Sequence, residues 1–158
     1  DTGDISVNMG QVSQIPGEVS ALENGNTYRG FNIDVGNPHA VVFVDDLSQV
    51  GDLKVAPSVT PEDAYPDGVN IEFVQFAENN QLNMRVFERG AGETLACGTG
   101  ACAAVVSGIR RGLLDSPVKV HTRGGDLQIA WSGVVDGVAQ PVIMTGPAVT
   151  VFEGETTI

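Results

Sequence analysis

The sequence predicts an α+β fold in which a mostly antiparallel sheet rolls around one central apolar helix. The first observation is the stretch 100–111, which is small or apolar on nearly every side, and a helix of that kind is buried. The second is that much of the remaining chain consists of short apolar or alternating runs between turn residues, the pattern of β-strands. Since such a helix needs cover all round, wrapping the sheet about it is the economical architecture.

The central helix is expected to begin within a few residues of Thr99, directly after a glycine-rich loop. Arg110 and Arg111 fall in its last turn, where cations interact favourably with the helix dipole. Gly112 follows as a suitable C-terminal stop. The sequence therefore predicts one helix, with its reactive end at the glycine-rich loop.

The other elements follow from local patterns. Residues 12–26 contain a Pro-Gly pair and an Asn-Gly turn, so we expect mostly loop. Residues 45–50 suit a short helix capped by an aspartate, and residues 51–68, with three prolines, suit a loop with room for one strand. Strands are expected at 6–11, 28–35, 40–44, 69–76, 82–87, 118–122, 126–131, 138–144 and 149–152.

Composition limits the class of protein. The 158 residues are 42% hydrophobic, which suits a single domain, 1–158, with its own core. A formal net charge of −12 disfavours nucleic acid and anionic membranes as partners. No apolar run approaches the ~18–20 residues of a membrane span, and no secretory leader pattern opens the chain. The two cysteines do not form a disulfide framework, so we expect a reducing, cytoplasmic setting.

Cys97 lies where the glycine-rich loop meets the helix. Free backbone N–H groups at a helix start, next to glycines, form a site for a carboxylate or phosphate. The same helix end should stabilise a thiolate, so we expect Cys97 to be the reactive cysteine with a lowered pKa. An alternative interpretation is a buried structural cysteine. Cys102, among alanines inside the helix, is expected to be structural.

Polar residues at three strand ends complete a predicted site. Asn37 and Asn70 offer amides, while Glu88 and Arg89 offer opposite charges beside the cysteine loop. Together they suit a zwitterion, with the helix end and Arg89 binding carboxylates and Glu88 binding an ammonium group. The simpler alternatives are a turn-forming Asn37, a solvated Glu88–Arg89 pair, and a structural His39.

These positions fall in short motifs. The motifs are Gly36-Asn37-Pro38-His39, Val69-Asn70, Arg85-Val86-Phe87-Glu88-Arg89-Gly90, Glu93-Thr94 and Ala96-Cys97-Gly98-Thr99-Gly100-Ala101. Together they closely resemble the second half of diaminopimelate epimerase, from about Met9 to Gly154, with 85–104 the most specific part. The family interconverts LL- and meso-diaminopimelate with two cysteines, in lysine and cell-wall synthesis. The resemblance implies that diaminopimelate is the substrate and that no cofactor or metal is needed. It also implies a homodimer and a missing N-terminal half, to which residues 146–158 cross.

The resemblance also implies roles for individual residues. Cys97 resembles the cysteine that accepts the substrate proton, and His39 and Glu88 resemble the pair that tunes the two thiols. Where Phe152 stands, the family often has a tyrosine linked to dimer contact, and phenylalanine lacks that hydroxyl. The substrate-binding positions are Asn37, Asn70, Glu88, Arg89, Gly98 and Thr99.

The chemistry of proton removal agrees with this interpretation. A carbanion at an amino-acid α-carbon needs donors at the carboxylate, which a helix N-terminus supplies. A pyridoxal enzyme would need a Schiff-base lysine, and Lys54 and Lys119 lie in no recognisable context. Inversion needs groups on opposite faces, and Cys102 lies ~140° around the helix and ~7 Å along it from Cys97. The second thiol must therefore come from elsewhere, and the resemblance implies that the missing half supplies it. We accordingly expect the isolated chain to be inactive.

Two other functions fit the same residues. One is a hydrolase or transferase with Cys97 as nucleophile and His39 as its base. The other is a non-catalytic module that binds amino acids through the same loops. Hydrogen exchange at the substrate α-carbon distinguishes a catalyst from a binder.

Overall fold

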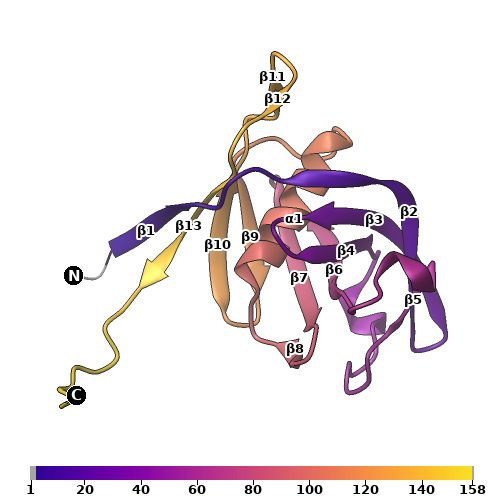
Figure 1. Ribbon diagram of the computed structural model, residues 1–158, viewed down its shortest axis with the longest axis horizontal. Helices are drawn as coiled ribbons and strands as arrows, with labels where there is room; N and C mark the ends of the chain where they lie inside the picture. Colours follow the sequence, from indigo (N-terminus) through magenta and orange to yellow (C-terminus); the bar gives the residue numbers. More distant parts are fainter. Residues whose placement is uncertain (1–2, 158) are drawn as a thin grey trace.

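A computed structural model describes residues 3–157 and shows one helix packed within an extended sheet (Figure 1). The helix is α1 (Gly98–Arg110), and two short 3-10 turns are η1 (Leu47–Gln49) and η2 (Glu62–Ala64). The strands are β1 (Gly3–Asn8), β2 (Ser13–Glu23), β3 (Asn26–Asp34), β4 (Pro38–Phe43), β5 (Ser58–Thr60), β6 (Asn70–Ala77), β7 (Gln81–Glu88), β8 (Gly92–Thr94), β9 (Val118–Thr122), β10 (Gly125–Ala130), β11 (Val134–Val135), β12 (Val138–Ala139) and β13 (Ile143–Ala148).

The main sheet has eleven strands, in the order β1-β13-β10-β9-β7-β6-β4-β3-β2-β5, with β8 paired to β7. Most neighbours are antiparallel, as predicted. Two pairs are parallel, β4 with β6 and β7 with β9. The parallel β4–β6 pairing sets His39 beside Asn70, which brings two predicted site residues together at the N-terminal ends of these strands.

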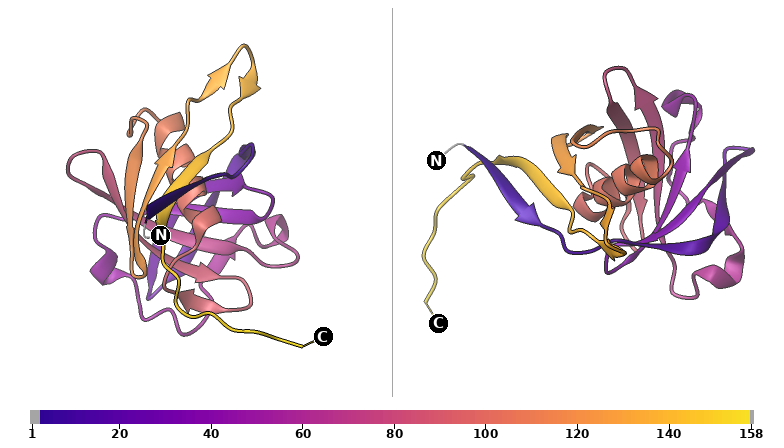
Figure 2. Two further views of the ribbon diagram at one scale, coloured as in Figure 1. Left: turned by 90° about the vertical axis from the view of Figure 1, so that its left-hand side faces the viewer. Right: turned by 90° about the horizontal axis from the view of Figure 1, so that it is seen from above.

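Helix α1 forms the centre of the larger core, as predicted. Its residues 100–108 are all buried, and it contacts β3, β4, β6 and β10 (Figure 2). The helix ends as expected, because Gly112 takes a positive φ of 68° and the Gly112 N–H donates to the carbonyl of Ile109. We call the apolar cluster around α1 the helix-side core.

A second apolar cluster lies on the other face of β4 and β6. Alternation along the strands separates the two faces: Val41 and Val74 belong to the helix-side core, whereas Val42 and Phe73 belong to the second cluster. Leu47 of η1 and Val59 of β5 pack against this second cluster. The sheet is thus covered on both faces at β4 and β6, which explains their nearly continuous apolar sequences.

Three expectations about local structure are wrong. Residues 12–26, expected as loop, contain the long strand β2, because the Pro16-Gly17 pair sits in an irregularity of the β2–β3 pairing rather than ending the strand. Residues 149–152, expected as a strand, are irregular, although their sequence alternates. The unforeseen β11–β12 hairpin interrupts the run expected at 138–144.

β1 and β13 form a two-stranded ribbon that leads away from the helix (Figure 1). They pair from Gly3↔Ala148 to Asn8↔Ile143, and every residue of β1 is exposed. The segment after β13 is also exposed, and Phe152 has 84% of its surface open to solvent. Apolar side chains are thus exposed to solvent on this side of the molecule.

No helix within residues 3–157 is long and apolar enough to cross a membrane. The same residues contain no group of three or more His, Cys, Asp or Glu side chains placed to bind a metal ion.

Candidate active site

Cys97 caps the N-terminus of α1. Its backbone is extended, with φ −136° and ψ 113°, and its sulfur accepts a hydrogen bond from the Gly100 N–H at 3.4 Å. The Thr99 hydroxyl lies 3.5 Å from the same sulfur, and the cysteine is partly exposed. The sulfur is thus accessible to a ligand and has two potential hydrogen-bond donors beside it.

The glycines after Cys97 allow close packing around the start of the helix. A Cβ atom on Gly98 would lie 3.0 Å from the Met144 sulfur. One on Gly100 would lie 2.5 Å from a carboxylate oxygen of Glu72. Gly100 therefore lets a buried carboxyl group approach the helix terminus.

The predicted lowering of the Cys97 pKa is wrong. Burial raises the pKa of the Cys97 thiol, and the nearby carboxylates of Glu72 and Glu88 raise it further. Hydrogen bonds from Thr99 and Gly100 oppose this effect without overcoming it. The local sequence predicted that Cys97 lies at a helix terminus, but it could not predict how deeply the rest of the chain buries the sulfur.

Cys102 is a structural cysteine, as expected. Its side chain is 0% exposed within the helix-side core, and burial raises its pKa to about 12. Cys97 is therefore the thiol available to a ligand.

His39 and Glu72 form a buried pair behind the cysteine. His39 Nδ1 lies 2.6 Å from Glu72 Oε1, and both side chains are 0% exposed. His39 Nε2 lies 3.0 Å from the Asn37 side-chain oxygen. Both ring nitrogens of His39 are thus engaged, and its contact on the side of the site is Asn37 rather than the Cys97 sulfur.

Glu72 is a site residue that our sequence reasoning missed. It stands in the run Ile71-Glu72-Phe73-Val74, where every neighbour is apolar and buried. A carboxyl group is almost never buried without a partner, so this charge within an apolar strand was the available signal. Burial raises the pKa of Glu72, and its contact with His39 opposes that rise.

The two predicted asparagines make different connections. The Asn37 side-chain amide donates to the Thr99 hydroxyl at 3.4 Å, which ties the start of β4 to the start of α1. Asn70 donates to the Pro38 carbonyl at 3.1 Å and accepts from the Arg89 N–H at 2.9 Å. Asn70 thus positions the loop that carries Glu88 and Arg89.

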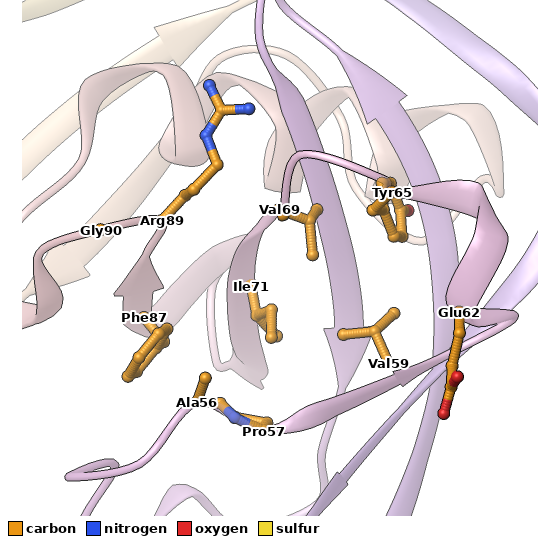
Figure 3. Close-up of a pocket in the computed structure, with 11 residues that line it drawn as sticks. Ala56, Pro57, Val59, Glu62, Tyr65, Val69, Ile71, Phe87, Arg89 and Gly90 are labelled. Carbon is orange, nitrogen blue, oxygen red and sulfur yellow. The ribbon is translucent and has the colours of Figure 1, made fainter.

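Glu88 and Arg89 are not paired with each other in this structure. Glu88 accepts a hydrogen bond from the Thr94 hydroxyl. Arg89 lies at the edge of a pocket of about 320 Å³, with its guanidinium directed away from the apolar lining (Figure 3). Val69 and Ile71 of that lining belong to the second cluster, so this pocket lies on the other face of the sheet from the helix.

A charged network holds the loop before Cys97. Arg85 donates from Nε to Glu93 at 2.7 Å and also donates to the backbone carbonyls of Val50 and Gly51. Arg123 contacts the same carboxylate at 3.1 Å. The Arg85 guanidinium and Arg123 lower the pKa of Glu93, which keeps it ionised.

The predicted residues thus fall into hydrogen-bonded groups. One runs from His39 through Asn37 and Thr99 to Cys97, with Gly98 in the same helix turn. Another joins Asn70 to Arg89. Glu88 is held separately, although its charge acts on the Cys97 thiol. The arrangement suits proton transfer at a carbon whose substituents bind the helix terminus and the charged loop.

Comparison with known proteins identifies the family. A family model described as diaminopimelate epimerase matches residues 31–151. The diaminopimelate epimerase of Cupriavidus metallidurans is 50% identical over 172 residues, covering 98% of this chain and 58% of that protein. The Cupriavidus pinatubonensis enzyme is 60% identical over 131 residues, covering 83% of this chain and 44% of that protein. The chain therefore spans about half the length of these relatives.

Solved structures share the fold at low sequence identity. A hydroxyproline epimerase from Agrobacterium vitis superposes with a TM-score of 0.63 at 17% identity, covering 90% of this chain and 50% of that one. A predicted epimerase from Pseudomonas aeruginosa gives a TM-score of 0.59 at 14% identity, covering 95% and 59% respectively. The family match over residues 31–151, most of the chain, shows that the chain belongs to the diaminopimelate epimerase family.

Proposed function

We propose that this chain forms one half of a cofactor-independent amino-acid epimerase that interconverts LL- and meso-diaminopimelate. The single observation that carries the proposal is Cys97 at the N-terminus of α1, partly exposed beside the Thr99 hydroxyl. The family membership supports diaminopimelate as the substrate. In this proposal the enzyme works in the cytoplasm, in lysine and peptidoglycan precursor synthesis.

The start of α1 has donors for the carboxylate of the substrate. The Gly100 N–H bonds to the Cys97 sulfur and the Ala101 N–H to the Cys97 carbonyl. The first N–H groups of a helix have no partner within it, which leaves those of Gly98 and Thr99 to bind the α-carboxylate. Negative charge that develops there on loss of the α-proton is stabilised by these donors and the helix dipole.

Cys97 exchanges the α-proton on one face of the substrate. As a thiolate, its sulfur takes the proton, and the electron pair of the broken C–H bond is delocalised into the carboxylate. As a thiol, it returns a proton in the reverse direction. Glu88 binds the substrate ammonium group, and that pairing weakens the effect by which its charge raises the Cys97 pKa.

The second proton-transfer group lies outside the chain in this proposal. Cys102 is fully buried and cannot reach the opposite face of a substrate. We place the second thiol in the part of the relatives that this chain does not match. The exposed strand β1 and the segment with Val149, Val151 and Phe152 would pack against that part, in an enzyme that is a homodimer.

The hydrolase alternative loses its main support. It needs His39 to take a proton from Cys97, yet the hydrogen bonds of His39 go to Glu72 and Asn37. The binding-module alternative stays open to experiment, because it uses the same loops without proton transfer.

Complementation tests the proposal. The chain is assayed with diaminopimelate alone, and again with the unmatched part of the Cupriavidus metallidurans enzyme, a mixture that we call the complemented enzyme. We expect epimerisation only in the complemented enzyme. Full activity of the chain alone would mean that a second base lies within these residues, and binding without activity in either sample would favour the module.

A further inference from the structure

Glu72 lies at the far end of the hydrogen-bonded group that reaches Cys97. We propose that Glu72 is a positioning residue: it fixes the protonated nitrogen of His39, which orients Asn37, so that the Thr99 hydroxyl donates to the Cys97 sulfur. This inference rests on the proposed function only in giving Cys97 the role of proton carrier. The contacts themselves are present in the chain.

The carboxyl group of Glu72 has one partner. Its Oε1 lies 2.6 Å from His39 Nδ1, while its Oε2 is buried with no hydrogen bond among the described residues. Both side chains are 0% exposed. A buried acid with a single histidine partner is tied energetically to the protonation of that histidine.

The hydrogen bonds determine where the protons lie. With the Asn37 amide nitrogen directed to Thr99, its side-chain oxygen faces His39 Nε2, and an oxygen can only accept. Nε2 therefore carries a hydrogen. One further proton lies between Nδ1 and Glu72 Oε1, either on the acid or on the imidazole. In both forms the buried pair is neutral overall, as its burial requires.

The orientation of Asn37 decides what the Thr99 hydroxyl does. While the Asn37 amide donates to Thr99, the single hydroxyl hydrogen of Thr99 is free for the Cys97 sulfur, 3.5 Å away. If the amide were reversed, its oxygen would face Thr99 and compete for that hydrogen. The thiolate form of Cys97 would then lose a donor.

The helix start accommodates this carboxyl group. A Cβ atom at position 100 would lie 2.5 Å from Glu72 Oε1 and 3.1 Å from its Cδ. Gly100 therefore leaves the space that the Glu72 carboxyl group occupies.

Two other titratable groups influence this region. The charge of Glu88 acts on Glu72 and Cys97, and burial together with the charge of Glu72 raises the pKa of Tyr65.

Nitrogen NMR tests the proton positions directly. The chain has two histidines, so ¹⁵N-histidine labelling gives separate signals for His39 and for the partly exposed His121, an internal control. We expect Nε2–H at His39 in the wild type and in Glu72→Gln, whose amide can donate to Nδ1. In Glu72→Ala, where water can replace the carboxyl group, we expect a mixture of tautomers. A single Nε2–H form in Glu72→Ala would overturn the proposal.

Alkylation of Cys97 tests the effect on the thiol. Glu72→Gln and Glu72→Ala both remove the carboxylate, so the charge effect cancels between them. We expect Glu72→Ala to react about three- to tenfold more slowly with iodoacetamide near neutral pH than Glu72→Gln, the worth of one hydrogen bond. Adding Thr99→Val to both should abolish the difference. Equal rates without Thr99→Val, or a difference that persists with it, would overturn the proposal.

Both measurements use the 158-residue chain without substrate, so they stand apart from the epimerase proposal. If complementation fails while alkylation behaves as expected, the positioning role holds and the substrate assignment fails. If Glu72→Ala does not fold, Gly100→Ala crowds the same carboxyl group and should slow alkylation relative to Gly98→Ala. Equal rates for those two variants would then count against the role of Glu72.

Discussion

The backbone N–H of Gly100 donates to the sulfur of Cys97 over 3.4 Å, so the proposed reactive thiol is also the side-chain cap of α1. This arrangement couples the chemistry of the site to the stability of the helix. A sulfur that moves toward a substrate must keep or exchange this hydrogen bond.

Substitution of Cys97 should separate capping from reactivity. Serine is a strong N-cap residue and alanine a poor one, so we expect Cys97→Ala to be less stable than Cys97→Ser by about 0.5–2 kcal/mol. Both variants lose the thiol, which makes Cys97→Ser the matched control. Urea denaturation measures the difference, and equal stabilities would show that the residue does not cap the helix.

The Cys97 thiol should ionise at a higher pH than the thiol of a free cysteine. Because burial raises its pKa, the alkylation rate of the folded chain should reach half its maximum at a higher pH than in the urea-unfolded chain. Cys97→Ser should abolish rapid labelling, since Cys102 is fully buried. A midpoint below that of the unfolded chain would contradict the structure and restore the helix-terminus argument.

Cys102 should make the chain less stable in alkali. Its pKa is raised to about 12 in the folded state, so the unfolded chain loses the Cys102 proton first as the pH rises. The stabilisation is therefore complete below the pKa that Cys102 has in the unfolded chain, and it is lost between that pH and about pH 12. Over this range we expect the free energy of unfolding of Cys102→Ala to decline less steeply than that of the wild type, by about 1 kcal/mol per pH unit. Parallel declines would refute the burial of this thiol.

Two glycine substitutions at the start of α1 should differ. An added Cβ normally favours a helix by about 0.5–1 kcal/mol. At Gly98 the neighbour is the flexible Met144, which can move aside, whereas at Gly100 it is the buried, hydrogen-bonded Glu72. We expect Gly100→Ala to lower stability by about 1–3 kcal/mol and Gly98→Ala to be milder. Thermal unfolding measures both, and a more stable Gly100→Ala would contradict this packing.

Local patterns were enough to predict the helix and most of the strands. Alanines and valines at 101–106 are apolar on all sides, and the strands of the sheet alternate or are wholly apolar. Strand β2 was missed because Pro16 and Gly17 usually end a strand, whereas here β3 and β5 supply pairing on its two sides. Residues 149–152 alternate like a strand, but the described chain offers them no partner.

The site was predicted in its parts but not in its connections. Cys97, Asn37 and Thr99 were selected by motif, and the structure joins them by hydrogen bonds. The burial that raises the Cys97 pKa comes from residues distant in sequence, so spacing could not reveal it. Glu72 was visible as a charge within an apolar strand, but its partner His39 lies 33 residues away on a neighbouring strand.

Deuterium exchange at the substrate α-carbon shows whether Cys97 carries the α-proton. Diaminopimelate is incubated in D₂O with the complemented enzyme carrying wild-type chain, Cys97→Ala or Cys102→Ala, and deuterium at the α-carbon is followed by mass spectrometry. We predict exchange with epimerisation for the wild type and Cys102→Ala, and no epimerisation for Cys97→Ala. Epimerisation by Cys97→Ala at the wild-type rate would show that Cys97 is not the proton carrier.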